Sequence, residues 1–105
     1  MLGRLQLPPG VKRGEAFRVR VIVQHPMETG FRRDYDGKVI PLDIVDQLAC
    51  TYAGREVFRA ELGSGIAANP YFVFPVLAGE SGEIVVAWSD GRGRSGRVSA
   101  MVKVA

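Results

Sequence analysis

The chain has 105 residues, 47% of them hydrophobic and 24% charged, and this size suits one domain, residues 1–105, with a single core. Fourteen basic residues against eleven acidic ones give a net charge of +3, and the basic residues are interspersed with acids instead of forming a stripe. This distribution argues against a nucleic-acid-binding surface, and the single cysteine excludes an internal disulfide and every multi-cysteine zinc site.

The predicted elements are short strands separated by Gly and Pro. A first strand covers residues 2–7 and ends at Pro8. The next, over residues 17–24, alternates apolar and polar side chains with a period of two, the pattern of a strand with one face in water. Pro26 lacks a backbone donor and restricts the residue before it, so regular strand pairing is expected to stop there.

A charged segment over residues 27–41 follows these strands. It contains the pair Asp36-Gly37, which favours a tight turn, so we expect a small β-hairpin here and not a disordered linker. The stretch "PLDIVDQL", residues 41–48, is the one place where the spacing of apolar residues favours a single helical turn.

Five further strands are expected in the rest of the chain, each alternating apolar and polar residues and each bounded by turn residues. They cover residues 46–52, 56–62, 71–77, 83–90 and 97–105. About seven short strands with such turns predict an all-β fold, an immunoglobulin-like antiparallel β-sandwich, with a small open barrel as the alternative. The cysteine pair of antibody domains is missing, so this analogy concerns architecture only.

A metal site is one interpretation of the stretch that follows the second strand. His25 and Met27 lie two residues apart, and with the thiol of Cys50 they could bind copper. However, Cys50 falls on the inward face of its strand and Pro26 separates the other two side chains. A buried structural cysteine is therefore favoured. A small copper- or iron-binding redox sandwich is kept as the alternative function.

The sequence predicts no catalytic residues and no cofactor. A nucleophilic Cys50 would need an exposed thiol with His25 beside it. The carboxylates near the charged segment are expected to be solvated, because nothing in the sequence desolvates one of them selectively: Glu28, Asp34, Asp36 and Asp43. The Gly-rich stretch "GRGRSG" lies between strands and not before a helix, so it does not predict a phosphate loop.

Two interpretations of residues 25–30 remain open from the residues alone. Pro26 and Gly30 could simply shape a bend. Alternatively, Met27 and Phe31 could be apolar anchors of a recognition edge with a charged rim, as in many protein interfaces.

Three stretches of the chain decide between these interpretations by their resemblance to a known family. "HPMETGFRRDYDGKVIP", "ANPYFVF" and "AWSDGRGRSG", in this order between Phe17 and the C-terminus, resemble the SoxZ family. Its members are the small non-catalytic subunits of the SoxYZ sulfur-carrier complex of bacterial thiosulfate oxidation. The resemblance implies an immunoglobulin-like sandwich paired with a similarly folded SoxY subunit, and "HPMETG" is its most specific part.

The resemblance also implies a division of labour between the two subunits. The reactive cysteine belongs to a flexible C-terminal arm of SoxY, so no function is assigned to Cys50. Other sulfur-oxidising enzymes would contact the complex transiently, and neither a nucleic acid nor a membrane is an expected partner. The chain alone could form a homodimer. The expected partner-binding residues are those of the "HPMETG" stretch: His25, Pro26, Met27, Glu28, Thr29 and Gly30.

The expected location is the periplasm. The N-terminal stretch "MLGRLQLPPG" has no apolar core of signal-peptide length. The resemblance implies export together with the partner, which would carry the signal for both.

Overall fold

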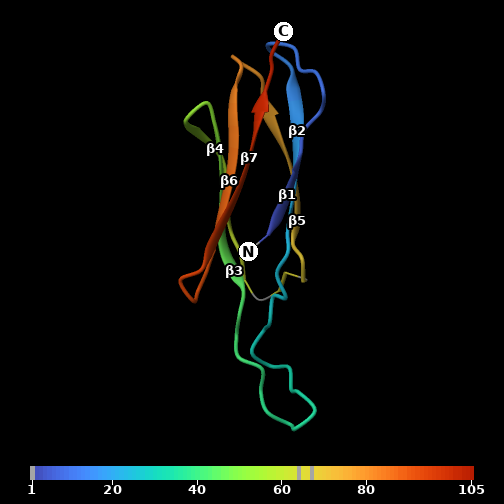
Figure 1. Cartoon of the computed structure of the whole chain (residues 1–105), viewed down its shortest axis with the longest axis vertical. Coiled ribbons are helices and arrows are strands. Elements are labelled where there is room, and N and C mark those ends of the chain that lie inside the picture. The colour runs from blue at the N-terminus through green and yellow to red at the C-terminus, as the bar shows by residue number, and fades with distance from the viewer. Residues whose placement is uncertain (1, 64, 67) are drawn as a thin grey trace.

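Two antiparallel sheets pack face to face, as Figure 1 shows for the computed structural model, which describes residues 2–63, 65–66 and 68–105. The seven strands are β1 (Gly3–Gln6), β2 (Ala16–Val23), β3 (Val45–Tyr52), β4 (Arg55–Glu61), β5 (Tyr71–Leu77), β6 (Gly82–Asp90) and β7 (Ser95–Val102). One sheet has the order β1-β2-β5 and the other the order β4-β3-β6-β7. The predicted β-sandwich is confirmed.

Strand β2 shows why the alternating pattern folds in this way. Its apolar residues Phe17, Val19, Val21 and Val23 are 5%, 0%, 1% and 0% exposed. The residues between them face outward, because successive side chains of a strand point to opposite sides. Each buried apolar side chain stabilises the fold by roughly 1.5–3 kcal/mol.

Aromatic side chains connect the two sheets. The rings of Phe58 on β4 and Phe74 on β5 stack with centroids 4.0 Å apart. Phe17 on β2 meets Tyr52 on β3 edge to face at 5.9 Å. These contacts fix the separation of the sheets on the side away from β1 and β7.

Trp88 fills the space between the sheets where β1 approaches β7. It is 2% exposed. A Cβ atom on Gly96 of β7 would lie 2.8 Å from three atoms of the indole, and one on Gly3 of β1 would also overlap it. Both glycines are therefore required by the close approach of the tryptophan ring.

The helical turn expected over residues 41–48 is wrong. Residues 45–48 are extended, and the pairing of β3 with β6 shifts register between Val45 and Gln47. This β-bulge turns both Val45 and Leu48 inward, where they are 0% and 1% exposed. Two buried residues three positions apart imitate helical spacing.

Within the part of the chain that the structure describes, no helix is long and apolar enough to cross a membrane.

Candidate functional site: a hairpin arm and its anchor

A hairpin of residues 28–43 projects beyond one end of the sandwich, and we call it the arm (Figure 1). At its base, Glu28 and Asp43 exchange backbone hydrogen bonds of 2.8 and 2.9 Å. Near its tip, Asp34 donates to the carbonyl of Lys38 at 2.9 Å, and Gly37 has a φ of +77°. The predicted hairpin and its turn at Asp36-Gly37 are confirmed, and the positive φ explains why glycine follows the aspartate.

The stretch "HPMETG" forms the connection between β2 and the arm. His25 and Met27 are 2% and 5% exposed, whereas Pro26 between them is exposed. Glu28, Thr29 and Gly30 are partly buried at the start of the arm. The alternation means that two of the expected partner-binding side chains face the interior of this chain.

His25 is held by three hydrogen bonds. Its backbone N–H donates to Oδ1 of Asn69 at 3.0 Å, and its carbonyl accepts the N–H of Asn69 at 2.7 Å. Its Nδ1 accepts the N–H of Met27 at 3.0 Å. A neutral imidazole with an accepting Nδ1 carries its proton on Nε2.

The Nε2 atom of His25 points at the base of the arm. It lies 3.2 Å from Oδ1 of Asp43. Its direction is not that of a well-aligned hydrogen bond, and Nε2 has no other partner among the described residues. The two atoms are therefore close but do not form a well-aligned hydrogen bond. His25 is buried, and a buried polar atom without a good hydrogen bond lowers the stability of the fold.

Met27 turns the chain from the strand into the arm. Its φ of +52° is in the left-handed region, which is uncommon for a side chain of this size. Its sulfur accepts the backbone N–H of Val45 at 3.2 Å, so the thioether satisfies a donor at the first residue of β3. The methionine thus fixes both strands of the arm at their roots.

Arg94 completes the anchor from the hairpin between β6 and β7. Its guanidinium contacts Asp43 at 2.6 Å and Asp90 at 2.7 Å. Burial opposes ionisation of Asp90, but backbone N–H groups of Arg94 and Arg92 and the guanidinium outweigh it. The pKa of Asp90 therefore lies below its ordinary value. We call His25, Met27, Asp43, Asp90 and Arg94 the anchor.

A second ion pair supports the arm from within. Nη2 and Nε of Arg32 donate to the two carboxylate oxygens of Glu28 at 2.5 and 3.1 Å. This hydrogen-bonded pairing lowers the pKa of Glu28 and raises that of Arg32. Glu28 is thus occupied by its own chain and holds the first residues of the arm in one geometry.

Exposed aromatic side chains occupy the arm beyond this pair. Phe31 is 86% exposed and Tyr35 is fully exposed, while Val39 and Leu42 are about half exposed. Aromatic residues held on a hydrogen-bonded hairpin lose little entropy on binding a partner. The arm therefore offers anchors for a protein contact.

The residues do not fit a metal ion. His25, Asp43 and Asp90 each place one ligand-type atom within 4.8 Å of the others. Arg94 already neutralises both carboxylates, and the hydrogen bond to Nδ1 leaves Nε2 of His25 with a proton where a metal would need a lone pair.

The copper ligands considered from the sequence are not brought together either. Cys50 lies in the middle of β3, paired with Phe58 and Val86, and is 0% exposed. Burial raises the pKa of its thiol to about 11. The thiol thus remains protonated near neutral pH, which suits neither a ligand nor a nucleophile.

Sequence reasoning missed most of the anchor. It treated Asp43 as a solvated loop carboxylate, but the Asp43 side chain is only 14% exposed and contacts Arg94. The other partners were present in two quoted stretches, Asn69 in "ANPYFVF" and Asp90 and Arg94 in "AWSDGRGRSG". The signal was a set of polar residues at strand ends, which meet only once the sheets are paired.

Solved structures confirm the architecture of the chain. Superoxide reductase (neelaredoxin) from Ignicoccus hospitalis is similar with a TM-score of 0.72 and 18% identity over 100% of this chain and 81% of that one. A candidate superoxide reductase from Thermotoga maritima has a TM-score of 0.74 and 18% identity over 98% and 85%. At this identity the likeness concerns the fold alone. Among curated proteins, none matches the chain significantly.

A family model assigns the chain more specifically. The model described as "Sulphur oxidation protein SoxZ" matches residues 5–101. The match includes the anchor, the arm and all but the last residue of β7. The chain therefore belongs to the SoxZ family of sulfur oxidation proteins.

Proposed function

We propose that this chain, as a single SoxZ-type domain, is the non-catalytic companion of a SoxY-type subunit whose C-terminal cysteine carries sulfur intermediates in thiosulfate oxidation. The family match over residues 5–101 carries this proposal. The buried thiol of Cys50, with its pKa raised to about 11, supports a role without chemistry of its own. Transient contacts of the complex with other sulfur-oxidising enzymes are part of the same proposal.

The "HPMETG" stretch contributes to partner binding chiefly by mounting the arm. His25 and Met27 are buried and hold the arm from below, whereas Pro26, Phe31 and Tyr35 are exposed above them. In this proposal the buried residues set the direction of the arm and the exposed residues touch the partner. Such a split between supporting and contacting residues is common in interfaces.

Co-expression with a tagged SoxY-type subunit tests the function. We expect the wild-type chain to co-purify with the tagged subunit in a stable complex. An unrelated immunoglobulin-like domain co-expressed in the same way is the control. A chain that stays monomeric beside the SoxY-type subunit would contradict the proposal.

Variants of the arm test its part in that complex. Phe31→Ala with Tyr35→Ala should weaken the complex by about 30-fold, because exposed aromatic anchors each contribute on the order of 1 kcal/mol. Met101→Ala is a matched control, since Met101 on β7 is 62% exposed and far from the arm in sequence. If the arm variant and the control bound the SoxY-type subunit with equal affinity, the arm would not be part of the interface.

We further propose that the chain works in the periplasm and is exported with its partner. Cell fractionation with and without the partner's signal sequence measures this directly. Periplasmic accumulation that does not depend on the partner would contradict joint export.

A further inference from the structure

Strand β5 carries an apolar stripe on the outer face of the three-stranded sheet. Tyr71, Val73 and Leu77 are 55%, 43% and 68% exposed, and Pro75 lies between the last two. Their neighbours Phe74 and Val76 point inward and are buried. A row of exposed apolar side chains along one strand is more than the isolated exposure that every soluble protein shows.

Arginine residues lie beside this stripe. Arg20 is paired with Val73 and Arg18 with Pro75 in the register of β2 and β5, and Arg4 of β1 is paired with Ile22. The three strands of this sheet contain no Asp or Glu. Among the described residues, none of the three arginines lies within ion-pair distance of a carboxylate. We call this surface the arginine–apolar face.

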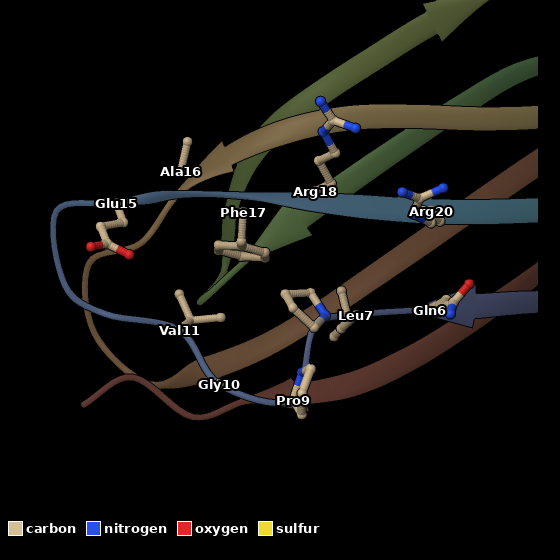
Figure 2. Close-up of a pocket in the computed structure, with 11 residues that line it drawn as sticks. Gln6, Leu7, Pro9, Gly10, Val11, Glu15, Ala16, Phe17, Arg18 and Arg20 are labelled. Carbon is tan, nitrogen blue, oxygen red and sulfur yellow. The ribbon is translucent and has the colours of Figure 1, made fainter.

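The arginine–apolar face is not flat on its β2 side, because the surface is hollowed there. β1 ends at Gln6, and the chain then leaves the sheet through Pro8 and Pro9 to reach Val11. This departure leaves a hollow beside the first half of β2, with Arg18 and Arg20 on the strand above it and Glu15 at the end where the chain enters β2 (Figure 2). A second, smaller hollow lies among residues that include Arg4, Ile22 and Tyr71.

The opposite sheet differs from this face. Its strands contain Asp and Glu as well as Arg, and Arg59 is paired with Glu56 at 2.8 Å, although Arg97 on β7 forms no ion pair with a described residue. The arginine–apolar face has no acidic residue on its strands, and among the described residues the Arg20 side chain donates only to the hydroxyl of Tyr71, at 3.1 Å. Unpaired cations beside aliphatic side chains complement a surface that is apolar and acidic.

We propose that the SoxY-type subunit docks on the arginine–apolar face through an apolar surface whose carboxylates lie opposite Arg4, Arg18 and Arg20. This inference rests on the proposed function and extends the contact beyond the arm. A protein fits better than a nucleic acid, because Tyr71 is the single aromatic side chain of the stripe on which a base could stack and three cations neutralise few phosphates.

Affinity measurements with the immobilised SoxY-type subunit test the face by matched pairs of variants. Val73→Asp should weaken binding by about 30-fold or more, because it places a charge in the apolar centre of the contact. Val57→Asp is its control, since Val57 is 38% exposed on β4, an edge strand of the other sheet. Arg18→Glu should weaken binding by about tenfold and reduce its salt dependence.

Arg97→Glu on β7 is the control for Arg18→Glu. The affinities of the two controls, Val57→Asp and Arg97→Glu, should stay within about twofold of the wild-type affinity. Circular dichroism checks folding, and Leu77→Asp replaces Val73→Asp if that variant does not fold. Wild-type affinity for Val73→Asp and Arg18→Glu would overturn the docking face and leave the proposed function intact. A wild-type chain that fails to bind would overturn both. The chain could instead bind a short DNA duplex. If Arg18→Glu abolished that binding and left the affinity for the SoxY-type subunit unchanged, the docking face would also be overturned.

Discussion

The guanidinium of Arg94 lies 2.6 Å from the carboxylate of Asp43, a residue 51 positions earlier in the chain. The same guanidinium contacts Asp90 in its own hairpin at 2.7 Å. One side chain thus ties the hairpin between β6 and β7 to the base of the arm. The Arg94 side chain is 52% exposed, so water weakens both ion pairs and their main effect is to fix the position of the arm.

Removing this connection should loosen the arm more than it destabilises the fold. For Arg94→Met we expect a modest fall in the free energy of unfolding, because the guanidinium is half exposed but the carboxylates of Asp90 and Asp43, 0% and 14% exposed, lose their charged partner. Hydrogen exchange at the amides of Glu28 and Asp43 should accelerate, because these amides close the base of the arm. Arg97→Met, on the same hairpin, is the control. Unchanged exchange at both amides would show that Arg94 does not anchor the arm.

The ionisation of Asp90 should make stability depend on pH in the acid range. Its pKa in the folded chain lies below the ordinary value of 3.8, so the unfolded state binds more protons there. The stabilisation is present above about pH 4 and is lost as pH falls through the folded pKa. Urea unfolding at several pH values should show this decline in the wild type and a flatter profile in Asp90→Asn. Asp36→Asn on the exposed arm is the control and should keep the wild-type profile.

The thiol of Cys50 should be inert in the folded chain. It is 0% exposed and its pKa is raised to about 11 by burial, so little thiolate exists at pH 8. A thiol-specific chromogenic reagent should react with the chain only after urea is added. Cys50→Ala should bind the SoxY-type subunit as the wild type does. Rapid reaction in the native state, or sulfur adducts on Cys50 during turnover, would contradict the proposed division of labour.

The glycine beside Trp88 should tolerate no side chain. Gly96→Ala places a methyl group 2.8 Å from the indole, and the buried ring has little room to move. We expect a loss of about 1–3 kcal/mol in the free energy of unfolding, the usual effect of overpacking. Gly79→Ala is the control, because a methyl group on Gly79 would have open space within 4 Å. Equal stability of the two variants would show that the indole can shift.

Much of the fold follows from the alternation of side chains. In β2 every second residue from Phe17 to Val23 is apolar and buried, and in β6 the same holds from Ile84 to Trp88, so a period of two is enough to locate these strands. The pattern fails at Asp46, where a bulge adds a residue that only the partner strand β6 reveals. A bulge depends on pairing between distant segments, and a local pattern does not contain that information.

The candidate site was predictable in part for the same reason. The turn at Asp36-Gly37 depends on neighbouring residues and could be predicted. The contact between Asp43 and Arg94 depends on how β3 and β6 are paired, so neither residue stood out in the sequence. The burial of His25 and Met27 was hidden as well, because Pro26 marks the end of a strand but not the direction of the side chains around it.

Pro75 in β5 affects how copies of the chain can associate while no partner subunit is bound. β5 is an edge strand of its sheet, and a proline there supplies no N–H to an approaching strand. Open-ended growth, in which one copy extends the sheet of the next, is thereby interrupted on the strand with the most exposed apolar side chains. Side chains on the flat of the sheet stay free to be covered, while polymerisation along its border is discouraged.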